Sequence, residues 1–282
     1  MKRRAIGVYR ETEFSPGKVD ADAAILDAVL AELASHGIET SAADAKTFVA
    51  SGASADAEII LAMCQSEAAL RKLAELEAAG AVAVNSALAI RNCYRDLLGA
   101  GLTRARIPAP EGVLLATGAP LDLRRLSALD LDAGVFVKRG DLHALGPNDV
   151  QQATGRAALN AALADFSQRG IGAVYVQQAA SGHTVKFYGV SGSEYFNVVA
   201  QEGEVREDVA RALAEAAGVA ATALGLEAWG GDAVVDGDRF AIVDFNDWPS
   251  FSLVRTPAAR AIARRALKLL ARPRPNLASR TI

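Results

Sequence analysis

Short apolar runs alternate with helical periodicity along the first 85 residues. The strands predicted there are Arg4–Tyr9, Glu58–Met63 and Ala81–Val84. Between them, Asp20–Leu33 and Glu67–Ala79 carry apolar residues at helical spacing. Strands that alternate with helices of this length predict a small parallel α/β domain over residues 1–85. In such a domain the ligand-binding loops follow the C-terminal ends of the strands.

The pattern changes after residue 85 and predicts a second domain over residues 86–282. A helix is expected over Ala87–Leu98, and Pro108 and Pro110 separate it from the strands that follow. The further elements expected are the strands Gly112–Leu115, Gly134–Lys138, Ala173–Gln178, Thr184–Val190 and Tyr195–Ala200 and the helices Pro147–Arg169 and Glu207–Leu224. The chain is therefore expected to be of the α/β class, with an α+β arrangement overall.

The run from Asp232 to Phe245 predicts a β-hairpin with Asp-Gly-Asp at its turn, residues 236–238. If these three residues form the loop, side-chain alternation places Asp232, Asp244 and Asn246 on one face of the hairpin. A two-residue turn would place Asp232 and Asp244 on opposite faces. The shared face is therefore a prediction that depends on the register.

Two carboxylates and an amide oxygen on one face suit Mg²⁺, which prefers hard oxygen ligands. The alternative is a surface hairpin whose acids are solvated. The apolar neighbours, Val243, Phe245 and Trp248-Pro249, favour the metal site, because acids embedded in an apolar strand need a compensating charge.

Composition narrows the possible functions. The chain has 282 residues, of which 51% are hydrophobic and 22% charged, and its net charge is -3. These values are typical of a globular protein and give no general electrostatic reason to bind nucleic acid or an anionic membrane. No stretch approaches the roughly 18 consecutive apolar residues of a membrane helix. The cysteines, Cys64 and Cys93, lack metal-binding spacing. No strand precedes a Gly-x-Gly-x-x-Gly turn, so a Rossmann dehydrogenase is disfavoured. We therefore expect a cytoplasmic protein with no nucleic-acid or membrane partner.

The segment GGDAVVDGDRFAIVDFNDWPSF resembles the metal-binding motif of the ATP-grasp superfamily. This superfamily includes D-alanine:D-alanine ligase, glutathione synthetase, peptide glutamate ligases and the ATP-grasp inositol phosphate kinases. The resemblance implies that Asp232, Asp244 and Asn246 bind Mg²⁺, or Mn²⁺ in its place. Asp244 departs from the family, which more often has glutamate there.

Two further segments resemble the nucleotide-binding parts of the same family. GVFVKRGDLHALG places Lys138 where the family has a phosphate-binding lysine. NSALAIRNCYRDLLGAG places Arg95 where a helix carries a cation toward the nucleotide. Arg91 lies four residues before Arg95, so a solvated basic helix face is the alternative.

VYVQQAASGHTVKFYGVSG resembles the strand that crosses between the two lobes and pairs with adenine. The residues implied for this hinge are Gln177, Gln178, Ala179 and Ala180. Lys186 corresponds to a basic residue that faces the phosphates. The resemblance further implies a Rossmann-like pre-ATP-grasp domain over 1–85, an ATP lobe over about 86–176 and a metal-binding lobe over about 177–270.

Three functions are compatible with this sequence. The first is an ATP- and Mg²⁺-dependent ligase that activates a small acidic substrate as an acylphosphate, with Lys138 and Arg255 at the reaction centre. The second is a kinase that phosphorylates a hydroxyl, with His143 handling the proton. The third is a nucleotide-binding regulator without turnover. Arg10 and Lys18 are candidates for an anion-binding loop, and Ser250, Ser252 and Arg255 are candidates for facing the acceptor. A homodimer is compatible with the family.

Overall fold

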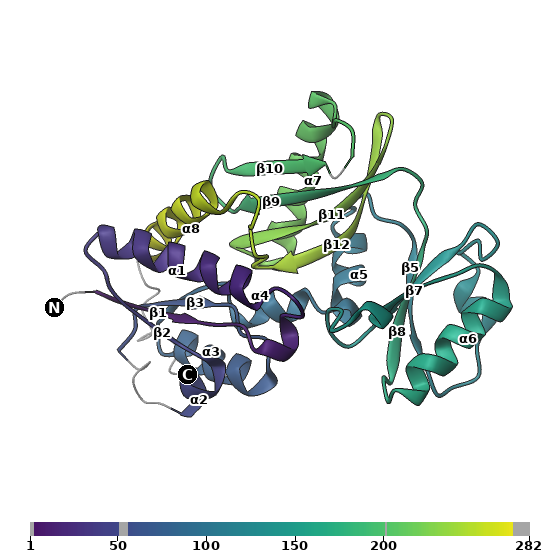
Figure 1. The fold of residues 1–282 in the computed structure, drawn as a ribbon, viewed down its shortest axis with the longest axis horizontal. Coiled ribbons are helices and arrows are strands. Elements are labelled where there is room, and N and C mark those ends of the chain that lie inside the picture. The colour runs from purple at the N-terminus through teal and green to yellow at the C-terminus, as the bar shows by residue number, and fades with distance from the viewer. Residues whose placement is uncertain (1–2, 51–55, 201, 273–282) are drawn as a thin grey trace, which may run out of the picture.

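The computed structural model describes residues 3–50, 56–200 and 202–272, and these form three four-stranded sheets (Figure 1). The ends of the predicted domains, residues 1–2 and 273–282, lie outside the described residues. The N-terminal sheet is parallel, with the order β2-β1-β3-β4. The small-lobe sheet, β5-β8-β6-β7, and the central sheet, β10-β9-β11-β12, are antiparallel. In Figure 1 the small-lobe sheet lies on the right and the central sheet at the top.

The N-terminal sheet confirms the predicted parallel α/β domain. Its elements are β1 (Arg4–Val8), α1 (Val19–Ser35), β2 (Glu39–Ala43), α2 (Ala45–Ala50), β3 (Ile59–Ala62), α3 (Glu67–Ala78) and β4 (Val82–Val84), with a 3-10 turn at Thr12–Phe14. Alternate residues of the inner strands face opposite helix layers: Ala5 and Ile59 pack with α1, whereas Ile6 and Ile60 pack with α2 and α3. Burial on both faces explains why these strands are continuous apolar runs.

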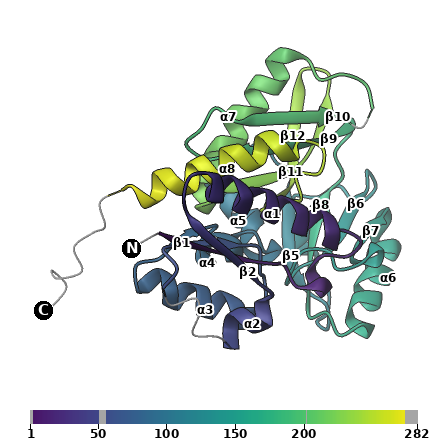
Figure 2. The same ribbon diagram turned by 60° about the vertical axis from the view of Figure 1, so that its left-hand side comes forward.

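The helix α8 (Arg255–Leu270) belongs to the same core, although it ends the described chain. It lies beside α1 in both views (Figures 1 and 2). Its buried residues Ala258 and Ile262 pack in one cluster with Leu26 of α1 and Ile59 of β3. The N-terminal layer is therefore closed by the C-terminal helix and does not depend on residues 1–85 alone.

The small lobe is the sheet β5-β8-β6-β7 covered by one helix. Its elements are β5 (Gly112–Ala116), β6 (Val135–Arg139), β7 (Val150–Ala153), α6 (Gly155–Gln168) and β8 (Ala173–Gln178), with 3-10 turns at Leu123–Leu126 and Pro147–Asp149. The helix expected over Pro147–Arg169 is wrong in its first part. Val150–Ala153 instead pairs with β6, and the helix begins only at Gly155, whose φ of 77° is unfavourable for other residues.

The central sheet and its helices complete the fold. The elements are α4 (Ala87–Asn92), α5 (Arg95–Arg104), β9 (His183–Val190), β10 (Phe196–Ala200), α7 (Glu207–Leu224), β11 (Ala228–Asp236) and β12 (Arg239–Asp247). Aromatic rings fill the space between the sheet and α7, and their closeness requires glycine. A Cβ on Gly189 would lie 2.2 Å from the Trp229 ring, and one on Gly231 would lie 2.2 Å from the Asp244 carbonyl oxygen.

The helix predicted over Ala87–Leu98 is two helices that break at Cys93 and Tyr94. The break separates the two arginines that the sequence placed on one helix face. Arg91 is half-exposed and pairs with Asp96 at 2.6 Å, whereas Arg95 begins α5 and is buried. The alternative of a solvated basic face is therefore wrong for Arg95.

Both cysteines are free and buried, and burial raises the pKa of each thiol. Within the described part of the chain, no helix has the length and apolar character needed to cross a bilayer.

Candidate active site

The hairpin β11–β12 has a different register from the one expected, yet it brings the predicted acids together. Asp236 pairs with Arg239, so the turn has two residues instead of three. A bulge between Asp232 and Ala233 then leaves Val243 as an extra residue on β12, and Asp232 pairs directly with Asp244. The bulge thus undoes the change of face that a two-residue turn would cause.

Each of the paired acids has its own cation. The Lys186 ammonium donates to Asp232 Oδ1 at 2.7 Å, and the Arg95 guanidinium lies 3.6 Å from Asp244 Oδ2. Burial opposes the charge on Lys186, but the hydrogen bond to Asp232 outweighs it and raises the pKa of this lysine. Burial likewise opposes ionisation of Asp244, yet Arg95 and Lys138 hold the pKa of this carboxyl below its usual range. The pKa shift therefore favours the ionised form of this candidate ligand.

Lys138 is buried, with 8% of its surface exposed, so it is not a surface lysine. Its ammonium donates to Gln177 Oε1 at 2.6 Å and to the carbonyl oxygen of the bulged Val243 at 3.0 Å. Burial lowers the pKa of Lys138, while Asp244 partly restores it. The bulge thus also supplies an acceptor that fixes this lysine.

A cavity of about 330 Å³, the intersheet cavity, lies between the small-lobe sheet and the central sheet. It collects most of the predicted site residues: Arg95, Lys138, Gln177, Gln178, Ala180, Lys186, Asp232 and Asp244. The sequence did not single out its apolar walls, which include Phe136 on the small-lobe side and Val234 on the central side. Strand alternation provides the signal for Phe136, because it shares a face of β6 with Lys138.

Part of the backbone of the predicted hinge is already hydrogen-bonded within the protein. The backbone N–H of Gln178 donates to Glu111 O at 2.8 Å, and that of Ala179 donates to Gly134 O at 3.0 Å. The Gln178 side chain also holds the Gly134 carbonyl oxygen at 2.8 Å. Ala180 is the first hinge residue that lines the cavity with no such backbone bond among the described residues. Backbone pairing to a base is therefore possible from Ala180 onward.

A second cavity of about 310 Å³, the interdomain cavity, lies between α1 and the central sheet. Lys186 and Asp232 line both it and the intersheet cavity, and Asn246 lines the interdomain side. Lys18, Ser250 and Ser252 also line it. Among the described residues, the side chains of Lys18 and Asn246 have no hydrogen-bond or ion-pair partner. The two cavities thus meet at the Lys186–Asp232 pair.

Arg10 lines the interdomain cavity, but its guanidinium is already bonded within the protein. It donates to the carbonyl oxygens of Met63 at 3.2 Å, Asp247 at 3.1 Å and Trp248 at 2.8 Å, and it pairs with Asp22 at 3.3 Å. Two of these bonds, to Asp247 and Trp248, hold the end of β12, directly after Asn246, against the N-terminal domain. Arg10 therefore supports the segment that carries the candidate ligands, and of the two cations proposed for an anion-binding loop Lys18 is the one without a partner among the described residues.

Replacing Arg10 with lysine is expected to destabilise the protein by roughly 2–4 kcal/mol, because one ammonium cannot satisfy three buried carbonyl groups and a carboxylate. Chemical denaturation measures this loss. Arg71→Lys, at a side chain 67% exposed, is the control and should change stability by less than about 0.5 kcal/mol. Equal stability of the two variants would contradict the supporting role of Arg10.

Besides Ala179, whose backbone is bonded to Gly134, two predicted residues line neither the intersheet nor the interdomain cavity. His143 Nε2 lies 3.4 Å from the buried Asp247 Oδ1, and the ring meets Tyr94 edge-on, so this loop is turned toward the N-terminal domain. Arg255 begins α8, and its side chain makes no hydrogen bond or ion pair within the described residues. Neither residue lines the intersheet or the interdomain cavity.

The donor set is compatible with magnesium. No group of three or more His, Cys, Asp and Glu side chains that could hold a metal occurs in residues 3–50, 56–200 and 202–272. Magnesium usually takes only one or two carboxylates and completes its shell with phosphate oxygens and water. The opposed Asp232 and Asp244, with the unengaged Asn246 amide, meet that requirement.

Comparison with solved structures identifies the fold. The chain matches D-alanine–D-alanine ligase from Bacillus anthracis, in a complex with ATP, with a TM-score of 0.72 and 12% identity over 95% of this chain and 98% of that one. It matches a RimK domain ATP-grasp protein from Sphaerobacter thermophilus with a TM-score of 0.67 and 19% identity over 93% of this chain and 99% of that one. It matches the VanG D-Ala:D-Ser ligase from Enterococcus faecalis with a TM-score of 0.71 and 12% identity over 96% of this chain and 100% of that one.

No family model and no curated protein matches the sequence. The structural matches nevertheless extend over nearly the whole of this chain and of each matched chain. The resemblance expected from the sequence motifs is therefore confirmed at the level of the fold: this protein has the ATP-grasp fold, preceded by a parallel α/β domain.

Proposed function

We propose that this protein is an ATP- and Mg²⁺-dependent ligase that activates the carboxylate of a small acidic substrate for attack by an amine. The observation that carries the proposal is the meeting of two cavities at Lys186 and Asp232. One cavity lies between two antiparallel sheets and contains the buried cations, and the other opens toward the N-terminal domain. A nucleotide in the first and a substrate in the second would bring the γ-phosphate and the carboxylate together at this pair.

The solved structures support the nucleotide assignment. The ligase from Bacillus anthracis has the same fold and was solved with ATP. The matched proteins also include a D-Ala:D-Ser ligase. Identities of 12% leave the substrate to be argued from this chain's own residues.

Each cation has a distinct part in the proposed reaction. Lys138 and Arg95 offset the charge of the nucleotide phosphates from the wall of the intersheet cavity. Lys186 faces the transferring phosphoryl group, and Lys18 holds the anionic end of the substrate in the interdomain cavity. Magnesium, held by Asp232, Asp244 and Asn246, would neutralise charge on the phosphate oxygens.

The chemistry proceeds in two displacements. A carboxylate oxygen of the substrate attacks the γ-phosphorus, the bond from this phosphorus to the ADP oxygen breaks, and an acylphosphate forms. An amine then attacks the acyl carbon, phosphate leaves with the bonding pair, and the nitrogen loses a proton to give the amide. Lys18 and Lys186 keep the carboxylate in line with the phosphoryl group.

Trapping with hydroxylamine tests the proposed chemistry. In the presence of ATP, Mg²⁺ and small dicarboxylic or amino acids, a ligase of this type forms an acyl hydroxamate together with ADP. A phosphorylated alcohol that resists hydroxylamine would instead identify a kinase. Tight binding of MgATP without ADP release from any carboxylate or polyol would identify a nucleotide-binding regulator.

The pH dependence of nucleotide binding should follow Lys138. Because burial lowers the pKa of Lys138, its ammonium is lost at a lower pH than that of an exposed lysine. Affinity for MgATP should be constant below this lowered pKa and fall as the pH rises through it. Calorimetric titrations between pH 7 and 10.5 measure the profile. Lys138→Arg stays charged over this range and should give a flat profile, and a flat wild-type profile would contradict the role of Lys138.

A further inference from the structure

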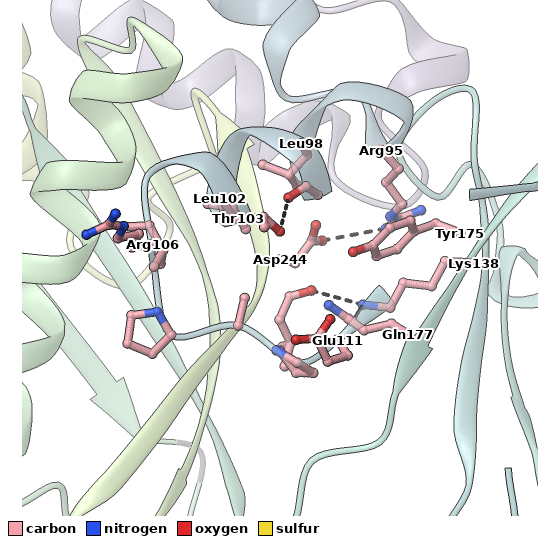
Figure 3. A pocket seen from close by; sticks show the side chains of 16 residues that line it. Arg95, Leu98, Leu102, Thr103, Arg106, Glu111, Lys138, Tyr175, Gln177 and Asp244 are labelled. Carbon is pink, nitrogen blue, oxygen red and sulfur yellow. Dashed lines mark hydrogen bonds and ion pairs between the residues drawn. The ribbon is translucent and has the colours of Figure 1, made fainter. Parts of the chain in front are cut away.

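A third cavity, the rear cavity, lies behind the nucleotide side of the site and has a volume of about 300 Å³ (Figure 3). It is formed by α5, by the linker from Arg106 to Glu111, by β6 at Lys138, by β8 and by β12. The residues that it shares with the intersheet cavity are Arg95, Lys138, Gln177, Val243 and Asp244. The hydrogen bonds from Lys138 to Gln177 and Val243 thus lie in the partition between the two spaces.

Part of the lining of the rear cavity is apolar. Leu98 and Leu102 of α5 and Ile107 and Pro108 of the linker supply apolar surface to it. The ring of Tyr175 closes another side, and it fits because both of its neighbours are glycine: a Cβ would lie 2.6 Å from the Tyr175 hydroxyl at Gly99 and 2.2 Å at Gly112. The volume is at the lower end of the range for small-molecule sites. An aromatic or branched body of about ten non-hydrogen atoms suits these walls.

The floor of the rear cavity carries a net positive charge. Lys138 and Arg95 are two buried cations, and Asp244 is the acid that lines the floor with them. Lys138 has three N–H donors and uses two, and the Arg95 guanidinium is held only at 3.3 Å by the Arg139 carbonyl oxygen and at 3.6 Å by Asp244. At the rim, Arg106 and Glu111 cancel in charge. One negative charge at the floor would therefore balance the cavity.

We propose that the rear cavity binds a small monoanion with an apolar body, such as an arylalkanoic acid. The anionic group lies at Lys138 and Arg95, and the body lies against Leu98, Leu102, Ile107 and Tyr175. Because the nucleotide phosphates require the same two cations, occupancy of the rear cavity weakens nucleotide binding. This second statement rests on the proposed function, whereas the binding of the anion does not. By linkage, bound nucleotide must lower the affinity for the anion by the same factor.

Binding of 3-phenylpropanoate tests the site, with the neutral 3-phenylpropanamide as the matched ligand. Thr103 lies on the exposed rim, and Thr103→Phe introduces a ring there, whereas Thr103→Ser keeps the hydroxyl that bonds to Gly99 O at 3.0 Å. We expect the acid to bind the wild type and Thr103→Ser equally, and to bind Thr103→Phe at least tenfold more weakly. The amide should bind the wild type at least tenfold more weakly than the acid. Equal binding of acid and amide would overturn the proposal.

NMR contacts provide a second measurement that does not depend on a variant. The phenyl protons of the acid should show contacts to the methyl groups of Leu98 and Ile107. Contacts to residues of the interdomain cavity alone would place the anion at Lys18 and overturn the assignment. Unchanged affinity for the acid in a folded Thr103→Phe protein would also overturn the assignment.

Competition with nucleotide completes the test. Saturating 3-phenylpropanoate should weaken MgATP binding at least threefold in the wild type and leave it unchanged in Thr103→Phe. Unchanged MgATP affinity in the wild type with the acid bound would overturn the coupling. If the wild type bound no MgATP at all, the proposed function would fail, and the binding and NMR results would still decide the anion site.

Discussion

Asp244→Asn is expected to abolish magnesium-dependent nucleotide binding, with a loss of MgATP affinity on the order of 100-fold or more. The change removes one of two carboxylates that face each other across the β11–β12 ladder, and the affinity of Mg²⁺ depends on that charge. It also leaves the buried Arg95 without its acid, so the local charge becomes unfavourable for the cation. Calorimetric titration with MgATP measures the loss of affinity. A second series at fixed ATP and varied Mg²⁺ measures the dependence on the metal.

Asp236→Asn is the matched control for this experiment. Asp236 is an exposed acid on the same hairpin, at the turn, and pairs loosely with Arg239 at 3.7 Å. This variant should bind MgATP as the wild type does. Asp244→Asn should still unfold in one cooperative transition, which separates a lost ligand from a lost fold. Full MgATP affinity in a folded Asp244→Asn protein would show that the metal is held elsewhere.

Lys138→Ala is the change with the second largest expected effect, a loss of ATP affinity of at least tenfold. The ammonium is buried between the two sheets and is fixed by Gln177 and by the Val243 carbonyl oxygen, so little side-chain entropy remains to be lost when phosphate binds. A charge-assisted bond from such a group to phosphate is strong. Competition of ATP against a fluorescent nucleotide measures the change, with Lys46→Ala on the exposed surface of α2 as the control. Equal affinities in the two variants would place the phosphates away from β6.

Local sequence patterns predicted the elements that are buried by their own periodicity. The helix Glu207–Leu224 and the strand Ala173–Gln178 have the expected ends, because both present a continuous apolar face to one core. The edge strand β2 was not predicted. Its residues Glu39–Ala43 are at most half-buried, so it is defined by pairing with β1 and not by hydrophobic alternation. Strand Val150–Ala153 was missed for the same reason, since it is an edge strand of the small-lobe sheet.

The candidate ligands were predicted for a reason that is only half right. The sequence required a three-residue turn to place Asp232 and Asp244 on one face, and the turn has two residues. A β-bulge at Val243 restores the arrangement, and nothing in the local sequence marks Val243 as the extra residue. At this bulge the Val243 carbonyl oxygen accepts a hydrogen bond from Lys138 of the small-lobe sheet, a contact that local sequence cannot predict.

Long-range contacts account for the remaining differences at the site. Arg10 was a candidate for ligand binding because it follows a strand, but the carbonyl groups that it binds are 53, 237 and 238 residues away in the sequence. The shared boundary of the two cavities at Lys186 and Asp232 likewise joins β9 to β11. Periodicity carries no information on pairings at such separations. Only the motif resemblance predicted that Lys186 and Asp232 belong to one site.

Thermal unfolding with and without ATP and Mg²⁺ tests the central claim most directly. A ligand that binds only the folded protein at 100 times its Kd adds about 2.7 kcal/mol of stability, which corresponds to a rise in Tm of roughly 5–10 °C for a chain of this length. The account predicts such a rise for the wild type and for Asp236→Asn, and its loss in Asp244→Asn. No change in the wild-type Tm at millimolar ATP and Mg²⁺ would contradict nucleotide binding in the intersheet cavity.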